Sequence, residues 1–474
     1  MKNNIVVAKF GGTSLADFAA MQRCASLVLN SPTIKVVVVS ASSGVTNLLT
    51  KLTKPDLLTA KREALLNKIL AIHSTILDQL EQSDHQQQQL LNLHLKLADL
   101  AQSASIQPNI KDEILSFGEQ ISSLLFTEVL NQLAGNQIYK AECFDVRKIL
   151  KTDNQFGNAV PNINRISELA THYFSDVVSS EDKGHSHVMV TQGFIGATEH
   201  GETTTLGRGG SDFSAALLAE AINATELQIW TDVKGIFTTD PRLTTNAKPI
   251  SEISFDEAAE LATFGAKVLH PATLLPAMRA NIPVYVGSSL APTQGGTKIV
   301  KSVENKPTYR AIALRKNQTL ITIKSPAMLH ATGFLAKVFG ILSQHHISVD
   351  LITTSEISIA ITLDNSVQNA EQQFYKHCMK ALQAFCEIQV ESDLSLIALI
   401  GNHLHANASI MGNNGIEASV FQSLNNISMR MICYGASQHN VCFLVKDNEA
   451  VSIISKLHQH LFEGDTAVTT GLAV

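Results

Sequence analysis

Two glycine-rich stretches that lie far apart in the sequence carry side chains able to bind a phosphorylated ligand. The first is Lys9-Phe10-Gly11-Gly12-Thr13-Ser14, and the second is Leu206-Gly207-Arg208-Gly209-Gly210-Ser211-Asp212. Glycine has no Cβ atom, so the backbone N–H groups of such stretches are accessible. Each stretch leads into an apolar helical pattern, and helix N-termini bind anions. The sequence therefore predicts two phosphate-binding loops.

The first stretch by itself leaves an alternative open. A Gly-Gly pair after a strand is often only a tight turn, and a lysine at a strand end is usually solvated. Lys9 also precedes the glycines, whereas the lysine of a P-loop follows the second glycine. The second stretch repeats the glycine density and adds a cation and a carboxylate, which favours phosphate binding over a plain turn.

These residue types suit phosphoryl transfer, which needs in-line positioning and positive charge around the migrating group. We expect Lys9 to neutralise charge on a γ-phosphoryl group and Asp212 to hold Lys9 or a metal ion in place. Mg²⁺ is expected to bind mainly through the phosphates of the nucleotide. No metal site made by the protein alone is therefore predicted.

Three other side chains suggest the second substrate. Arg208 can pair bidentately with a carboxylate, and Glu119 can accept an ammonium group, which together describe an amino acid. Glu119 lies on an apolar helical pattern, where a solvated glutamate remains the alternative. Thr46 follows the strand predicted at 34–40 and is either a ligand contact or a helix N-cap.

The elements that must position these residues alternate between strands and helices. Short β-branched runs predict strands at 5–10, 34–40, 187–191, 226–231 and 282–287. Alternation of this kind indicates an α/β domain with a largely parallel sheet covered by helices on both faces.

The helices between these strands include a hairpin. Residues 56–102 show helical spacing of leucine and isoleucine, and the polar run 86–89 is expected to separate the two helices. This hairpin is interpreted as structural rather than catalytic. Further helices are expected at 113–130 and 256–269.

An internal repeat follows a linker near Asn305 and Pro307. Residues 347–352 and 427–432 correspond to each other, and each follows a helical pattern and precedes a strand and another helix. This order is the ferredoxin-like βαββαβ plan. The end of the chain offers only 467–470 as a last strand, so we expect the two copies to exchange strands.

Composition excludes several classes of function. The chain has 474 residues and a net charge of −6, with no block of lysine and arginine, so we expect no nucleic-acid partner. No apolar run reaches the roughly 18 residues of a membrane helix, and no signal peptide is visible. The six cysteines are scattered and expected to be reduced, which fits a cytoplasmic protein.

In combination, the motifs resemble those of the aspartate kinases within the amino-acid kinase family. The resemblance rests on the two glycine stretches, on Trp230-Thr231-Asp232 and on Phe264-Gly265-Ala266-Lys267-Val268-Leu269-His270-Pro271. The tail, with Ser348-Val349-Asp350-Leu351-Ile352-Thr353-Thr354-Ser355-Glu356, is similar to the lysine-sensitive aspartokinase III type. The resemblance covers nearly the whole chain.

The resemblance implies a fold and an activity. It implies a three-layer αβα amino-acid kinase domain at 1–300 and two ferredoxin-like ACT domains at 310–392 and 393–474, the second strand-exchanged with the first or inserted into it. It implies transfer of the γ-phosphoryl group of ATP, with Mg²⁺, to the β-carboxylate of L-aspartate. The product, 4-phospho-L-aspartate, is the entry to lysine, threonine and methionine biosynthesis.

The resemblance also assigns residues. Lys9 and Asp212 become the catalytic pair. The aspartate contacts are Thr46, Glu119, Arg208 and Ser211. The ATP contacts are Lys9, Phe10, Gly11, Gly12, Gly209, Gly210, Thr231, Asp232, Phe237, Arg242 and Lys267. Phe237 stands where a tyrosine is frequent, so a hydroxyl contact there would be absent.

The ACT-like repeats imply feedback inhibition by L-lysine. The implied effector contacts are Met328, Phe334, Leu335, Ser348, Val349, Asp350, Thr354, Ser355 and Glu356. Arg430 corresponds to Asp350 in the second copy and would repel a cation, so only the first copy is expected to bind lysine. Ala331 replaces an expected serine, which leaves a weaker response or another effector as alternatives.

Edge strands of the repeats need covering, so we expect a homodimer through the ACT domains, with a tetramer as the alternative in the inhibited state. Two other functions were weighed. A sibling kinase acting on glutamate or acetylglutamate is disfavoured by the helical insertion and the double tail. A catalytically silent amino-acid sensor is disfavoured by Lys9 with Asp212.

Overall fold

The computed structural model describes residues 4–55, 57–81, 84–102, 106–135, 139–175, 186–265, 269–329, 331–364, 372–402, 404, 420, 424 and 427–463. Its contacts divide the chain into two compact units. The first unit comprises Met1–Ile236, Pro249–Phe255 and Lys267–Val303. The second comprises Phe237–Lys248, Asp256–Ala266 and Glu304–Val474.

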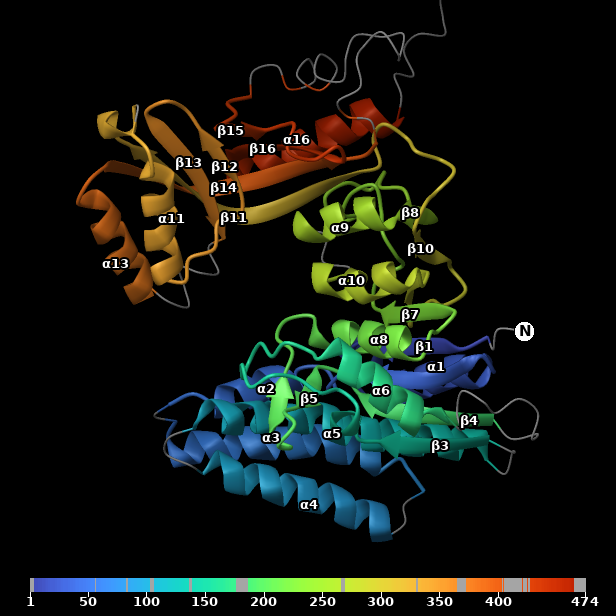
Figure 1. Ribbon diagram of the computed structural model, residues 1–474. Helices are drawn as coiled ribbons and strands as arrows, with labels where there is room; N and C mark the ends of the chain where they lie inside the picture. The colour runs from blue at the N-terminus through green and yellow to red at the C-terminus, as the bar shows by residue number, and fades with distance from the viewer. Residues whose placement is uncertain are drawn as a thin grey trace, which may run out of the picture. The chain divides into compact units, whose positions relative to one another are not determined.

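The first unit is built on an eight-stranded sheet with the order β3-β4-β2-β1-β7-β9-β10-β8 (Figure 1). Its strands are β1 (Val6–Phe10), β2 (Ile34–Val39), β3 (Tyr139–Phe144), β4 (Ser186–Gln192), β7 (Glu226–Thr231), β8 (Glu252–Ser254), β9 (Val284–Ser288) and β10 (Gly296–Val300). Only the β9–β10 pair of this sheet is antiparallel. The expectation of a largely parallel sheet is confirmed.

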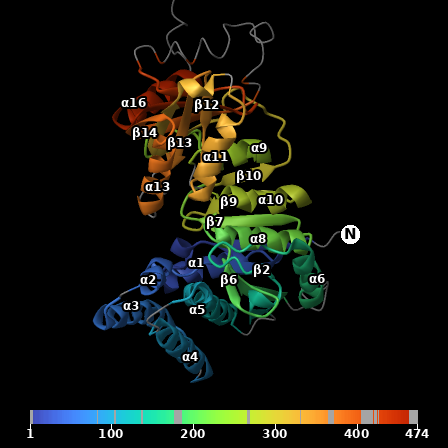
Figure 2. The ribbon, with the colours of Figure 1, turned by 60° about the vertical axis from the view of Figure 1, so that its left-hand side comes forward.

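Helices lie on both faces of this sheet. They are α1 (Phe18–Leu29), α2 (Val45–Leu52), α3 (Thr59–Leu77), α4 (Asp84–Ala101), α5 (Pro108–Ala134), α6 (Ile163–Tyr173), α8 (Gly210–Ala221) and α10 (Pro271–Ala280). Helices α3, α4 and α5 gather on one side of the strands and α8 with α10 on the other, in both views (Figure 1, Figure 2). The result is the expected three-layer αβα domain.

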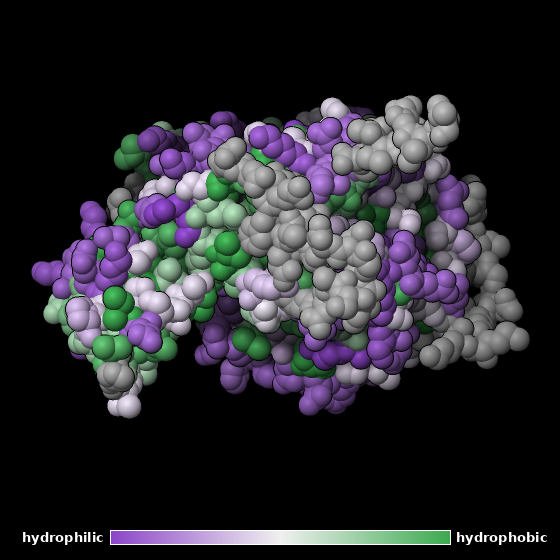
Figure 3. Space-filling model, turned by 90° about the horizontal axis from the view of Figure 1, so that it is seen from above, coloured by the Kyte–Doolittle hydropathy of each residue, from purple (hydrophilic) through white to green (hydrophobic). Residues whose placement is uncertain are grey.

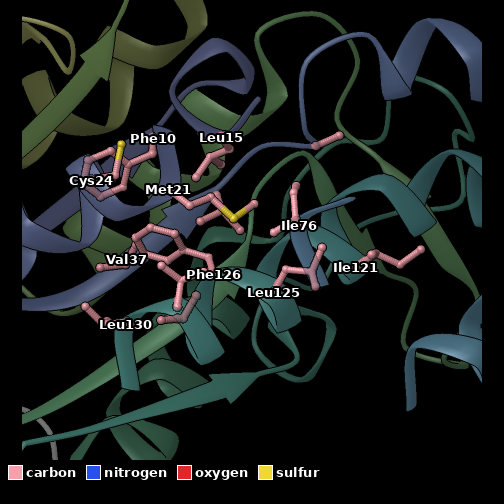
Figure 4. Packing of buried hydrophobic residues seen from close by; sticks show 14 of the residues in the cluster. Phe10, Leu15, Met21, Cys24, Val37, Ile76, Ile121, Leu125, Phe126 and Leu130 are labelled. Carbon is pink, nitrogen blue, oxygen red and sulfur yellow. The ribbon is translucent and has the colours of Figure 1, made fainter. Parts of the chain in front are cut away.

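The strands are buried because their central residues are apolar and β-branched. Alternate residues of β1 face opposite sides of the sheet. Ala8 and Phe10 enter the hydrophobic core that α1 and α5 complete, where Phe10 and Phe126 lie with their ring centroids 5.7 Å apart (Figure 4). Lys9 therefore faces the opposite side, toward α8.

Two predicted helix boundaries in this part of the chain are wrong. The glutamine run 86–89 does not separate the hairpin helices but lies inside α4, because glutamine is a good helix former. The helix expected at 256–269 is α9 (Phe255–Thr263), which ends just before Gly265. Gly265 has φ +108°, and a Cβ atom there would lie 2.8 Å from the carbonyl oxygen of Leu314.

The second unit holds a six-stranded antiparallel sheet with the order β12-β13-β11-β14-β16-β15. Its strands are β11 (Ala311–Lys324), β12 (Ile352–Thr354), β13 (Ser358–Asp364), β14 (Glu387–Ile400), β15 (Met431–Cys433) and β16 (Asn440–Lys446). Its helices include α11 (Phe334–Gln344), α13 (Gln372–Gln383) and α16 (Asp447–His458). Two separate hydrophobic cores lie under the two halves of the sheet.

The two central strands serve both halves of this sheet. β11 pairs with β13 over 318–324 and with β14 along its whole length, and β14 pairs with β16 over 394–400. Asn317 and Asp393 both have φ +58°, in the middle of β11 and β14. The repeats therefore share their longest strands.

The strands expected at 347–352 and 427–432 begin later, as β12 and β15. Leu351 donates its backbone N–H to the Thr362 hydroxyl at 3.0 Å, so this N–H is withdrawn from a regular ladder. Most of the helix expected at 417–424, and the strand candidate at 467–470, lie outside the described residues. Among the described residues, no helix combines the length and the apolar character needed to cross a bilayer.

Candidate active site

The first glycine stretch forms a tight corner at the end of β1. Gly11 donates its N–H to the carbonyl oxygen of Trp230 at 3.0 Å, which continues the pairing with β7. A Cβ atom on Gly12 would lie 2.8 Å from the carbonyl oxygen of Ala41, so only glycine allows this approach. The 3-10 turn Gly12–Leu15 follows, and the Ser14 hydroxyl lies 2.6 Å from that of Ser289.

The second glycine stretch connects the short strand β6 (Thr203–Thr205) to α8. β6 pairs with β5 (Ile195–Ala197) in a two-stranded sheet. Gly207 and Gly209 have φ +74° and +75°, a left-handed conformation that other residues rarely adopt. Helix α8 begins at Gly210 and carries Asp212 in its first turn. The stretch thus ends at a helix N-terminus, as expected.

The two stretches meet through one ion pair. The Lys9 Nζ atom lies 2.6 Å from Asp212 Oδ1, and both side chains are mostly buried. The approach does not have the geometry of a hydrogen bond, so Asp212 Oδ1 has no aligned donor. Lys9 is therefore held close to the start of α8 while its ammonium group stays available to a ligand.

A cavity of about 520 Å³ surrounds this pair. Loops at the C-terminal ends of parallel strands line it, which is where α/β proteins bind ligands. The predicted site residues among its lining are Lys9, Gly11, Gly12, Thr46, Glu119, Gly209, Gly210, Arg208, Ser211, Asp212 and Thr231. The catalytic pair and all four predicted aspartate contacts thus line one cavity.

Glu119 is the most deeply buried acid of this cavity. Its Oε1 atom accepts the backbone N–H of Ala41 at 3.1 Å, and its Oε2 atom has no hydrogen-bond partner. Burial raises the pKa of this carboxyl to about 8, although the bond from Ala41 and the charge of Lys9 oppose the rise. An incoming ammonium group would satisfy Oε2 and favour the charged form.

Unsatisfied polar atoms gather in this cavity. Ser42 Oγ and Glu119 Oε2 are buried and lack a hydrogen-bond partner within the protein, and Asp212 Oδ1 has only its ion-pair contact with Lys9. Buried polar atoms without partners are rare in folded proteins and need an explanation. A polar ligand that binds here would provide the missing partners.

Sequence reasoning missed some of the lining. Ser40, Ser42, Asn47 and Phe194 line the cavity but were not predicted as contacts. The only available signal was the small, polar exit of β2. The N-cap interpretation of Thr46 is wrong, because Gly44 is the N-cap of α2, and the ligand contact of Thr46 stays a prediction.

Two other predicted ATP contacts, Phe10 and Asp232, do not line this cavity. Phe10 is fully buried in the core, so its side chain faces away from the cavity. Asp232 contacts Thr231 at 3.0 Å but does not line the cavity. Phe237 and Arg242 belong to the second unit, and Lys267 lies outside the described residues. Their roles stay predictions.

A metal site made by protein side chains would need several acidic, histidine or cysteine ligands close together. Among the described residues, no three or more histidine, cysteine, aspartate or glutamate side chains lie together as metal ligands would. Asp212 is the acid of the cavity that lies nearest to Lys9, and it is paired with it. The donor set fits a metal ion that binds through the phosphates of a nucleotide.

The predicted effector contacts lie on the first repeat of the second unit. They come from the turn before α11, the start of α11 and the segment around β12, and most of them are exposed. Asp350 forms an ion pair with Arg315 at 3.1 Å. Its counterpart Arg430 pairs instead with Glu391. The two repeats therefore differ in charge at equivalent positions, as the sequence indicates.

Family models match both units of the chain. The model described as the amino acid kinase family matches residues 4–288. A model described as an ACT domain matches residues 321–370 and 406–461. The first match alone covers more than half of the chain.

Known proteins match over nearly the full length. The chain is 48% identical over 465 residues to the lysine-sensitive aspartokinase 3 of Escherichia coli, covering 97% of this chain and all of the relative. It is 34% identical to the chloroplastic aspartokinase 3 of Arabidopsis thaliana, covering 97% of this chain and 82% of the relative.

A solved structure is also similar. The crystal structure of E. coli aspartokinase III in complex with aspartate and ADP, its R-state, matches with a TM-score of 0.85, covering 97% of this chain and 100% of that one at 48% identity. The lysine and aspartate complex of the same enzyme, its T-state, matches with a TM-score of 0.80 and the same coverage.

Proposed function

Because this chain belongs to the aspartate kinases of the amino acid kinase family, we propose that it transfers the γ-phosphoryl group of ATP to the β-carboxylate of L-aspartate. The product would be 4-phospho-L-aspartate, the first intermediate of lysine, threonine and methionine biosynthesis. The observation that carries this proposal is the Lys9–Asp212 ion pair in a cavity that Glu119 and Arg208 also line.

The reaction needs charge neutralisation more than covalent help. Lys9 would stabilise the negative charge that develops on the migrating phosphoryl group, and Asp212 would hold the ammonium group in place. The backbone N–H groups of both glycine stretches would donate hydrogen bonds to the phosphate oxygens, so no side chain is needed for these contacts. Mg²⁺, bound through the phosphates, would supply further positive charge.

Aspartate would lie between opposite charges. Arg208 would pair with a carboxylate of the substrate and Glu119 with its ammonium group, while Thr46 and Ser211 provide hydroxyl groups. The aspartate and ADP complex of the E. coli enzyme supports these two ligands. The nucleotide contacts at Thr231, Asp232, Phe237, Arg242 and Lys267 are proposed from the family motifs.

Regulation is proposed for the second unit. L-lysine would bind the first repeat, where Asp350 and Glu356 are anionic, and would inhibit the enzyme. The E. coli relative is described as lysine-sensitive and was solved with lysine. Asp350 is already paired with Arg315, so an incoming ammonium group would compete with that side chain.

A homodimer through the ACT domains completes the proposal, with a tetramer in the inhibited state as an alternative. Ile352 on the edge strand β12 and Ile357 just after it are apolar and exposed, as is Leu335 at the start of α11. Hydrophobic residues are also visible among hydrophilic ones on the face in Figure 3. The domain boundaries 1–300, 310–392 and 393–474 and a cytoplasmic location remain part of the proposal.

A coupled assay of ADP release tests the function. We expect turnover with ATP and aspartate but not with glutamate or acetylglutamate, and loss of turnover when lysine is titrated in. Asp350→Ala should relieve this inhibition and keep the uninhibited rate, since allosteric coupling is typically about 1–3 kcal/mol. Turnover with glutamate alone would favour the sibling kinase, and indifference to lysine would reject the regulatory part.

A further inference from the structure

One buried carboxylate outside the cavity has no role in the chemistry described so far. Asp112 lies in the first half of α5 and is fully buried. The nearest charged group acting on it is Lys111, which is exposed and adjacent in the chain. Burying a carboxylate is costly unless hydrogen bonds compensate, so its contacts indicate what it is kept for.

Asp112 binds two segments that are distant in the sequence. Its Oδ2 atom accepts the backbone N–H groups of Gly157 and Thr205, both at 2.8 Å. Its Oδ1 atom accepts the Thr205 hydroxyl at 3.0 Å. Burial raises the pKa of this carboxyl, and the three bonds oppose the rise. One side chain thus fastens both the 157 turn and the end of β6 to α5.

These two segments also hold each other. Ala159 donates its N–H to the carbonyl oxygen of Thr205 at 2.9 Å. Gly207 lies so close to the 157 turn that a Cβ atom there would be 2.7 Å from Asn158 Oδ1. Arg208 comes next. The backbone position of Arg208 therefore depends on these contacts, which connect its segment to Asp112.

Asp112 and Glu119 share one face of α5. They are seven residues apart, which is two helical turns. Glu119 reaches the cavity directly, and Asp112 fixes the strand that leads to Arg208. We propose that Asp112 is a positioning residue for aspartate. It fastens the segment that leads to Arg208 to α5, the helix that carries Glu119, and so sets the distance between Arg208 and Glu119.

This inference rests on the proposed function, in which Arg208 pairs with a carboxylate of the substrate and Glu119 with its ammonium group. The span between those two groups is fixed by covalent geometry, so the protein must match it closely. Small errors in the placement of a charged pair weaken binding strongly. The N–H groups of Gly11 and Gly12 do not depend on Asp112, whereas those of Gly209 and Gly210 follow Arg208 in the supported segment, so ATP binding should weaken less than aspartate binding.

The test is Asp112→Asn, which keeps the size of the side chain but removes its charge and leaves one oxygen where two accepted hydrogen bonds. We expect KM for aspartate to rise about tenfold or more, as for loss of a hydrogen bond to a charged group. We expect KM for ATP to rise by a clearly smaller factor, because Gly11 and Gly12 still hold the phosphates, and kcat at saturating aspartate to change less than about twofold. Steady-state kinetics with each substrate varied in turn measure all three.

Asp153→Asn is the matched control. Asp153 accepts the N–H groups of Gln155 and Val160 at 3.1 and 2.9 Å, so it also holds the neighbouring loop but does not touch β6. Its KM for aspartate should stay near that of the parent. Thr205→Val removes only the hydroxyl bond to Asp112 and should raise KM for aspartate by a smaller factor. If Asp112→Asn does not fold, Thr205→Val decides.

The outcomes separate the inference from the function. A parent enzyme without aspartate-dependent turnover would overturn the proposed function and this inference with it. An active parent whose variants melt earlier but keep the KM for aspartate would overturn the inference alone, since Asp112 would then be merely structural. Equal losses toward aspartate and ATP would also overturn it.

Discussion

Two cavities are lined by adjacent residues of α5, and their difference shows what makes a ligand site. The cavity described above contains Glu119, while its neighbour in the chain, Gln120, lines a second cavity of about 380 Å³. The second cavity is also polar, with Lys96, Arg147 and Asp145 among its lining. Size and charge alone therefore do not distinguish the two.

The second cavity has its hydrogen bonds already made. Arg147 donates to Asp145 at 2.7 and 2.9 Å and to Thr203 at 3.0 Å. Gln192 donates to Ser123 at 2.7 Å and accepts the N–H of Val146 at 2.9 Å. None of the buried atoms without partners among the described residues belongs to its lining, whereas Ser42 Oγ and Glu119 Oε2 belong to that of the first cavity. Unmet hydrogen-bonding capacity marks the first as the site.

The largest expected effect is on kcat, and it should differ between the lysine of the first cavity, Lys9, and that of the second, Lys96. Lys9→Ala should lower kcat by a factor on the order of 10²–10³, since it removes one charged donor from the transition state. Lys96→Ala, in the second cavity, should leave kcat near the parent value. ADP release at saturating substrates measures both. Equal effects of the two changes would break the comparison.

The next effect compares neighbouring residues on α5. Glu119→Gln removes the partner of the substrate ammonium group and should weaken aspartate binding roughly 10- to 100-fold, the range for a charged hydrogen bond. Gln120→Ala faces the second cavity and should not change the KM for aspartate. An increase in this KM for Gln120→Ala as large as for Glu119→Gln would contradict the assignment of the two cavities.

Glu119 should also leave a signature in stability. Because its pKa is about 8 in the folded protein and 4.5 in a solvated chain, the folded state binds the extra proton between these values. Stability is therefore lost as pH rises from 4.5 to 8. Without ligands, Glu119→Gln should melt at a higher temperature than the parent at pH 8, and the difference should shrink toward pH 5. A gap independent of pH would refute this cause.

The smallest effect on catalysis is expected between α3 and α4, outside the lining of both cavities. His73 on α3 and His94 on α4 are buried with their ring nitrogens 3.2 Å apart, and His94 Nδ1 lies 2.9 Å from the Leu90 carbonyl oxygen. Burial and the neighbouring ring lower the pKa of His73 to about 3, and burial lowers that of His94. His73→Phe should leave turnover at pH 7 unchanged.

The same histidine should matter in acid. The unfolded chain takes up protons below the ordinary histidine pKa of 6.5, whereas the folded hairpin keeps His73 neutral down to about 3. Stability is therefore present above 6.5 and falls as pH drops through this window. Urea unfolding at pH 7 and 5 should show a smaller loss for His73→Phe than for the parent. An equal loss would show that other groups dominate.

Much of the site could be predicted because its motifs are local. Lys9 with Gly11 and Gly12, and Arg208 with Asp212, each lie within a few residues, so type and spacing suffice. Ser42 could not be singled out, because a serine in a small polar loop resembles any turn residue. Asp112 could not be found either, since its partners Gly157 and Thr205 are brought to it only by folding.

In the fold, too, local features could be predicted from the sequence and long-range pairing could not. The strands β1, β2, β4, β7 and β9 were predicted nearly to their ends because their centres are apolar, whereas β3, β8 and β10 of the same sheet were not predicted, because polar residues or glycine interrupt them. The strands β12 and β15 were misplaced because they are short edge strands, and because Thr362 bonds to the backbone just before β12. Shared use of β11 and β14 is a matter of pairing partners, which periodicity does not report.

Because both repeats use β11 and β14, the ways in which this protein can evolve are limited. A cut anywhere between the two repeats would remove strands from both, since β11 and β14 run through each half. Neither half could be deleted, duplicated or replaced by another effector-binding domain as an independent unit. New effector responses in such a chain must therefore arise by point substitution within an intact pair.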